Sequence, residues 1–109
     1  MEHFNEWMKK ERKARNLTLD QVAKKLRTHK GYVSGIENAK VNPPSPRICR
    51  RIAALFNMHP GQVLAMAMID KAPLEIRGPL RAHLYLHPVK WENFDGDKAP
   101  AAAPQKAVV

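Results

Sequence analysis

Residues 17–43 read LTLDQVAKKLRTHKGYVSGIENAKVNP, and this stretch decides the fold of the chain. Thr18 followed three residues later by Gln21 is a capping box, which predicts the start of a helix. The apolar side chains of that helix are Val22, Ala23 and Leu26. The apolar pattern then resumes, which predicts a tight turn and a third helix from about Lys30 to Asn38. We therefore expect two short helices joined by a turn.

Three further helices flank this stretch. Apolar residues recur at helical spacing from Phe4 to Met8, so residues 3–15 are predicted to form the first helix. The pairs Ser45–Pro46 and His59–Pro60 each combine an N-cap residue with proline at the first helical position. We expect a fourth and a fifth helix to begin there, so that five helices fill residues 3–70.

The pattern changes beyond residue 70. Leu, Ala, Leu and Leu alternate with polar residues over 80–86, which is typical of a strand. We expect such a strand to pair with another one, for example the same segment of a second subunit. Residues 99–109 are rich in Ala and Pro and are predicted to be disordered. The sequence thus divides into a helical domain (1–70), an extension (71–98) and a tail (99–109).

The charge is strongly positive and unevenly distributed. The chain carries a formal net charge of +9. Residues 1–60 hold thirteen Lys or Arg and five Asp or Glu, whereas residues 61–109 hold six and five. A basic N-terminal half favours a polyanionic partner, because neutralised phosphates release counterions.

Other features of composition exclude several classes of protein. Cys49 is the single cysteine of the 109 residues, so no intramolecular disulfide is expected. No apolar stretch approaches the roughly 18 to 20 residues that span a bilayer. We therefore expect a soluble, cytoplasmic protein that does not bind membranes.

The third predicted helix presents a small, polar outer face. If Val33, Ile36 and Glu37 point inward, the outward residues are Gly31, Ser34, Gly35 and Asn38. Glycine lowers helix propensity, so two glycines in one short helix suggest a functional reason. A helix with so little bulk can approach the major groove closely. Basic and polar residues flank this face, namely Thr28, His29, Lys30, Lys40 and Asn42.

Two charged residues fall on apolar stripes. Arg12 lies eight residues after Phe4 in the first helix, and Glu37 lies four residues after Val33 in the third. Because their charges are opposite, we expect a partly buried structural ion pair that fixes the third helix against the first.

The sequence resembles the lambda-repressor/Cro-like, or XRE-type, helix-turn-helix family. The resemblance covers about residues 8–66 and rests on Leu17-Thr18, Val22-Ala23, Leu26, Tyr32-Val33-Ser34, Ile36-Glu37-Asn38, Asn42-Pro43, Ile52-Ala53 and Leu55. It implies an all-α, five-helix DNA-binding domain whose third helix enters the major groove; phage repressors of this family are examples that define this docking mode. The Arg12 and Glu37 positions also match an ion pair of the family.

The resemblance also implies a set of DNA-contacting positions. Lys30, Gly31 and Gly35 align with base-reading sites, and His29 with the residue that caps the recognition helix. Since glycine has no side chain, we expect readout to depend on Thr28, Lys30, Tyr32 and Ser34. The full predicted set is Thr18, Arg27, Thr28, His29, Lys30, Gly31, Tyr32, Ser34, Gly35, Asn38, Lys40 and Asn42.

Three positions depart from the family pattern. Arg27 and Ala39 stand where the family often has glycine, and Leu19 replaces a commonly polar phosphate contact. We expect Arg27 to take over that contact. A left-handed Ala39 would be strained, so we expect Asn38 to end the helix instead.

These observations predict a homodimeric, sequence-specific regulator of transcription, most readily a repressor. An alternative is an antitoxin or adaptor whose residues 74–98 hold a protein partner. A third hypothesis, RNA binding without sequence preference, has less support, because no aromatic stacking platform is visible. No phosphate loop or catalytic triad is present, so we expect neither an enzyme nor a cofactor. His83 and His87 would share one strand face, but no carboxylate or cysteine completes a site, so no metal is expected.

Overall fold

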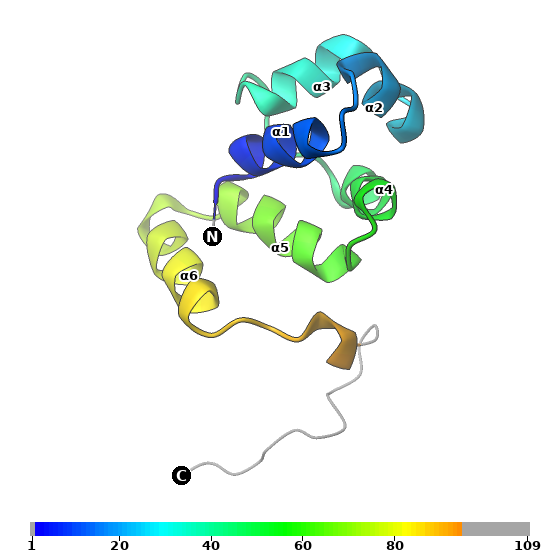
Figure 1. Ribbon diagram of the computed structural model, residues 1–109. Helices are drawn as coiled ribbons and strands as arrows, with labels where there is room; N and C mark the ends of the chain where they lie inside the picture. Colours follow the sequence, from blue (N-terminus) through cyan, green and yellow to red (C-terminus); the bar gives the residue numbers. More distant parts are fainter. Residues whose placement is uncertain (1, 95–109) are drawn as a thin grey trace, which may run out of the picture.

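The structure, a computed structural model, describes residues 2–94 of the chain. Within that range it has six α-helices and one 3-10 turn (Figure 1). They are α1 (Phe4–Ala14), α2 (Leu19–Leu26), α3 (Lys30–Glu37), α4 (Pro46–Phe56), α5 (Pro60–Lys71), α6 (Leu74–Leu86) and η1 (Trp91–Asn93). The all-α prediction is confirmed, and α1 to α5 are the five predicted helices. The tail predicted to be disordered, residues 99–109, lies outside the described residues.

The first five helices enclose one hydrophobic core. α4 packs against α5, α2 contacts α3 and α4, and α1 contacts α3 and α5 (Figure 1). Trp7 joins two of these helices, with its ring centroid 5.3 Å from that of Phe4 and 5.8 Å from that of Phe56. The buried cluster consists of Phe4, Trp7, Met8, Val22, Ala23, Leu26, Val33, Ile36, Cys49, Ile52, Ala53, Phe56, Val63, Met66 and Ala67.

The helix starts follow the capping residues. Ser45 and His59 precede prolines that occupy the first positions of α4 and α5. Proline fits there because the first N–H groups of a helix have no intrahelical acceptor. The Gly61 N–H donates to His59 Nδ1 at 2.9 Å, so the imidazole satisfies one of these groups.

The predicted strand at 80–86 is wrong, because those residues belong to α6. The alternation of apolar residues also places Leu80 and Leu84 four apart, a spacing that a helix satisfies equally well. Arg81 then faces the protein body and forms an ion pair with Asp70, the penultimate residue of α5. This anchor holds a helix despite Pro79 in its interior. Neither α6 nor any other helix of residues 2–94 has the length and hydrophobicity to cross a bilayer.

Four turns between helices use left-handed residues other than glycine: Asn16, Arg27, Ala39 and Asn57. Ala39 has φ 56°, so the expectation that the chain avoids a left-handed alanine here is wrong. Asn38 is the C-cap of α3, and the next residue reverses the chain. The Ala39 N–H donates to the Ile36 carbonyl at 3.2 Å and the Lys40 N–H to the Gly35 carbonyl at 2.8 Å. These are the two hydrogen bonds of a Schellman motif, which outweigh the local strain.

Candidate nucleic-acid interface

The start of α2 is a complete capping box. The Gln21 N–H donates to Thr18 Oγ1 at 3.1 Å, and the Thr18 N–H donates to Gln21 Oε1 at 2.8 Å. The Thr18 hydroxyl therefore accepts a backbone hydrogen bond and keeps its own proton to donate. Because a helix N-terminus carries partial positive charge, this end of α2 is suited to a phosphate.

The turn between α2 and α3 is held by its backbone. Arg27 adopts φ 59° and ψ 45°, and the Thr28 N–H donates to the Ala23 carbonyl at 2.9 Å. His29 is the N-cap of α3, and its Nδ1 accepts the Tyr32 N–H at 3.2 Å. The turn thus aligns the first turn of α3, which begins at Lys30, with the end of α2.

The inner face of α3 is firmly buried. Val33, Ile36 and Glu37 are at most 5% exposed. Glu37 receives two hydrogen bonds from Arg12, from Nε to Oε2 at 2.7 Å and from Nη2 to Oε1 at 3.0 Å. The Arg12 Nη1 also donates to the Leu17 carbonyl at 2.8 Å. One guanidinium therefore ties α1, the α1–α2 turn and α3 together.

The outer face of α3 carries little bulk. Its residues are Gly31, Ser34, Gly35 and Asn38. A Cβ on Gly31 would lie 3.5 Å from the nearest atom, in the His29 ring, which is ordinary contact. Asn38 Nδ2 donates to the Ser34 carbonyl at 3.0 Å and to the Ser34 hydroxyl at 3.2 Å. The amide is thereby held along the helix, with its oxygen turned away from these bonds.

Three of the predicted cations at this end of the molecule are exposed. They are Arg27, Lys30 and Lys40, and none forms an ion pair within residues 2–94. Two neighbouring arginines behave differently, because Arg51 donates to the Leu26 carbonyl and Arg15 to the Phe56 carbonyl, each at 3.0 Å. Those two satisfy helix C-termini, whereas the exposed three remain available to phosphates.

Comparison with known protein families supports this assignment of a helix-turn-helix. A family model described as Helix-turn-helix matches residues 8–63, more than half of the chain. The chain belongs to the XRE-type, lambda repressor-like helix-turn-helix family. This family comprises DNA-binding regulators of transcription, and its members bind double-stranded DNA. No curated protein and no solved structure matches the chain significantly.

In a helix-turn-helix the second helix is the recognition helix, and α3 occupies that position after α2. The structure brings most of the predicted contact residues to α3, to the turn before it and to the loop after it (Figure 1). Tyr32 packs on one side against the core, where its ring is partly buried. Its ring centroid also lies 6.3 Å from that of His29. Burial raises the pKa of Tyr32, so its phenol stays neutral.

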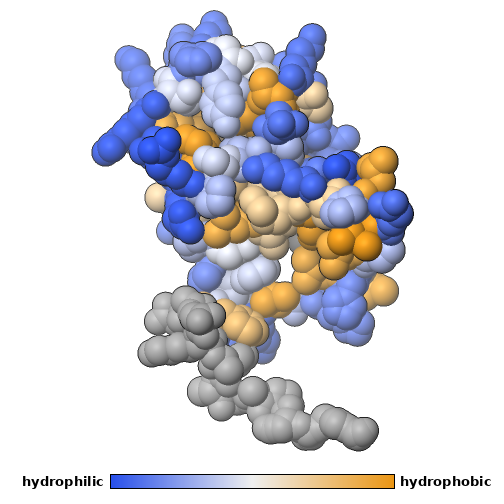
Figure 2. Space-filling model, turned by 180° about the vertical axis from the view of Figure 1, so that it is seen from behind, coloured by the Kyte–Doolittle hydropathy of each residue, from blue (hydrophilic) through white to orange (hydrophobic). Residues whose placement is uncertain are grey.

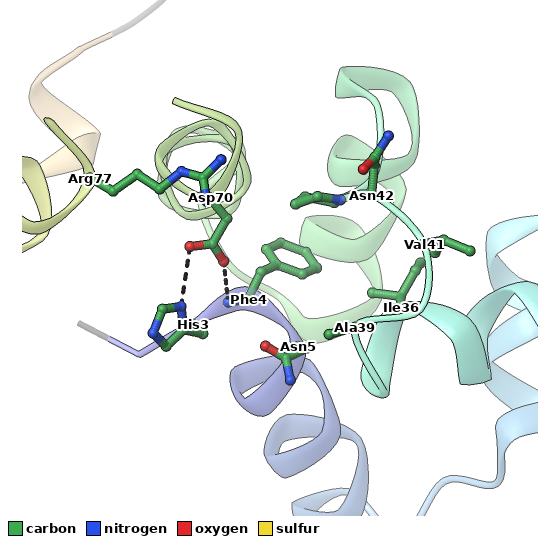
Figure 3. Close-up of a pocket in the computed structure, with 10 residues that line it drawn as sticks. His3, Phe4, Asn5, Ile36, Ala39, Val41, Asn42, Asp70 and Arg77 are labelled. Carbon is green, nitrogen blue, oxygen red and sulfur yellow. Dashed lines mark hydrogen bonds and ion pairs between the residues drawn. The ribbon is translucent and has the colours of Figure 1, made fainter. Parts of the chain in front are cut away.

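Val41 is an exposed apolar residue beside α3 that the sequence pattern did not single out. It lies in the loop after α3, and it is 42% exposed. A Cβ on Gly35 would lie 3.1 Å from Val41 Cγ1, so the loop closes over the recognition helix at this glycine. Figure 3 shows Val41 on the loop between Ala39 and Asn42, directed toward the α3 side. A β-branched apolar residue between Lys40 and Asn42 is the signal that could have identified it.

Proposed function

We propose that this protein is a homodimeric repressor that reads operator DNA with α3 in the major groove. The observation that carries the proposal is the pairing of a nearly bare outer face on α3 with a rigidly buried inner face. A helix backbone can approach base edges closely only where side chains leave room. The Arg12–Glu37 pair gives that approach a fixed angle.

The contact residues fall into two proposed groups. Base edges are read by Thr28, Lys30, Tyr32, Ser34 and Asn38, while Gly31 permits the approach and Gly35 leaves room for Val41 beside the helix. Phosphates are held by Thr18, Arg27, His29, Lys40 and Asn42. Val41 joins the first group, because its exposed methyl groups can contact a thymine methyl, which is an apolar feature of the major groove.

The size of one recognition helix supports homodimerisation. A single α3 of eight residues covers only a few base pairs, and a second copy would double the sequence that is read. Two copies would address half-sites about one helical turn, roughly 34 Å, apart. We assign DNA binding to residues 1–70 and the subunit interface to the extension 71–98. Bound across promoter DNA in the cytoplasm, such a dimer represses by occupying the site.

Selection of duplexes from a random pool tests this function. We expect a preferred sequence with two symmetric halves, which reports specificity and dimer geometry together. Lys30→Ala should weaken binding to the selected duplex, whereas Lys90→Ala, which removes an exposed lysine of the extension, should not. If no duplex is preferred over random competitor at physiological ionic strength, the proposal is wrong.

The alternative function is an antitoxin or adaptor that holds another protein through its extension. The observation in its favour is the exposed apolar surface of α6, where Leu74, Ile76, Leu80, Tyr85 and Leu86 are 39–76% exposed. Purification of the tagged chain from its own cells separates the two functions. A stoichiometric second protein, combined with no preferred duplex, would support the adaptor.

A further inference from the structure

Helix α6 has fewer stabilising features than α1 to α5. It contains Gly78 and Pro79 in its interior, and none of its residues is buried. Both residue types disfavour a helix, because glycine adds backbone freedom and proline removes a hydrogen-bond donor. A helix of 13 residues with this composition needs packing to be stable. Among the helices it packs mainly against α5, so most of its circumference is uncovered.

Only one side of α6 is anchored. Arg81 forms an ion pair with Asp70 of α5, and Arg77 donates to the Ala72 carbonyl just before the helix. Asp70 also accepts the Phe4 N–H at 2.7 Å and lies 3.4 Å from the His3 imidazole. Figure 3 shows this junction, with Arg77 reaching from α6 over the Asp70 carboxylate. Both arginines therefore face the body of the protein, away from the rest of the helix surface.

A lateral stripe of α6 has the spacing of a helix–helix seam. Its members are Ile76, Leu80 and His83 of α6 and His87, the C-cap residue that follows the helix; they are four, three and four residues apart. At about 100° per residue they lie within an arc of about 60°. Spacings of this kind place side chains against a second helix, as in coiled coils. Ile76 and Leu80 are 45% and 39% exposed, and Figure 2 shows hydrophobic surface gathered on the α6 side of the molecule.

The rings of the two histidines of this stripe lie close together. Both are exposed, and their ring centroids are 4.7 Å apart with 40° between the ring planes. Two imidazoles bound to one tetrahedral zinc have centroids about 5 Å apart, because each Zn–N bond is about 2.1 Å. Histidines four apart on one helix face are an established zinc-binding arrangement. No metal was expected because no carboxylate or cysteine completes a site with these two histidines. In a strand the same residues would be farther apart, whereas the helical structure brings their rings together.

One chain supplies only half of a tetrahedral site. Within residues 2–94, no group of three His, Cys, Asp or Glu side chains could hold a metal ion. A twofold axis beside the stripe would supply the two missing ligands, because an isologous interface places each patch against the same patch of the second copy. We propose that His83 and His87 of two copies share one divalent transition-metal ion, with Ile76 and Leu80 packed beside it. This site rests on the homodimer proposed above, and it names that dimer's interface.

The chemistry of the ligands limits which metal ions could bind. Four neutral imidazoles suit Zn²⁺, Cu²⁺ or Ni²⁺ and do not suit the oxygen-seeking ions Mg²⁺ or Ca²⁺. The cations nearest to the site on α6 are Arg77 and Arg81, and the latter is neutralised by Asp70. Metal binding would thus link the supply of zinc to the amount of dimer, and through it to operator occupancy.

Sedimentation equilibrium of the full chain, with Zn²⁺ or with EDTA, tests the site. We expect Zn²⁺ to lower the dimer dissociation constant by about tenfold or more, with one zinc per two chains. Co²⁺ in place of Zn²⁺ should give the visible absorption of a tetrahedral centre. The variant His83→Ala/His87→Ala should lose both effects, and each single variant should weaken them. His59→Asn removes an imidazole elsewhere but keeps an N-cap residue, so it should retain them.

Other results would overturn the site. Binding of one zinc per chain without a change of mass would rule out a site shared between two copies. Undiminished zinc binding by the double variant would rule out His83 and His87 as the ligands. Both histidines are exposed, so the variant keeps the core, which circular dichroism verifies. Duplex selection in EDTA is the separate test of the proposed function. A protein that selects a symmetric operator in EDTA and ignores zinc keeps its function and loses this site.

Discussion

Arg12 and Glu37 form a bidentate ion pair across 25 residues of sequence, with Nε–Oε2 and Nη2–Oε1 distances of 2.7 and 3.0 Å. The two side chains are only 12% and 3% exposed. Paired charges at this depth set geometry more than they add stability, because desolvation offsets much of their attraction. The geometry they set is the angle of α3 against α1, on which the proposed approach to DNA depends.

Removal of one partner of this pair should destabilise the protein. Arg12→Ala leaves the Glu37 carboxylate buried without its cation, which costs about 3 to 5 kcal/mol. The melting temperature should therefore fall by more than about 10 °C. Lys13→Ala, which removes an exposed charge from the next position, serves as the control. Equal melting of Arg12→Ala and wild type would contradict a buried, structural Arg12–Glu37 pair.

Ala39→Gly should stabilise the protein. The left-handed φ of 56° strains a residue with a Cβ by about 1 to 2 kcal/mol, and glycine loses about half of that gain to its greater freedom in the unfolded chain. We expect a net stabilisation of about 0.5 to 1 kcal/mol in urea denaturation. Ala54→Gly, at an exposed site inside α4, should have the opposite sign. A destabilising Ala39→Gly would contradict the Schellman ending of α3.

The helical domain was predictable because its signals are local. Thr18 with Gln21 marks a helix start through hydrogen bonds between neighbouring residues. Pro46 after Ser45 marks another start, because proline fits the first position of a helix. The Arg12–Glu37 contact was also predictable, because each charge interrupts an apolar stripe. The left-handed conformation of Ala39 was not predictable, because two loop hydrogen bonds outweigh the preference of alanine for negative φ.

The extension was mispredicted because its determinant is distant. Alternation over 80–86 fits a strand and a helix alike, and the choice depends on Arg81 reaching Asp70 of α5. That contact is invisible in a pattern of hydrophobicity. Val41 was missed for a related reason: its position over Gly35 follows from the path of a loop, which periodicity does not describe.

Cys49 should resist alkylation in the native protein. Burial raises the pKa of its thiol to about 11, so almost no reactive thiolate exists at pH 8. The side chain is also fully enclosed in the core. Labelling with iodoacetamide should be slow in buffer and rapid after unfolding in guanidinium chloride. Rapid stoichiometric labelling of the folded protein would show that the α4 contacts around Cys49 open readily.

Gly31→Ala separates the demands of folding from those of DNA binding. An alanine Cβ at this position meets only the His29 ring, at 3.5 Å, so the unbound protein has room for it. Alanine favours a helix over glycine, so urea denaturation should show a gain of up to about 1 kcal/mol. The same methyl group would stand between α3 and the base edges, and affinity for the selected duplex should fall by about tenfold, or about 1.4 kcal/mol. Opposite signs in the two measurements would mean that the glycine is present for the groove and not for the fold. An alanine variant that is more stable and binds the duplex as tightly as wild type would mean that the α3 backbone does not approach DNA at residue 31.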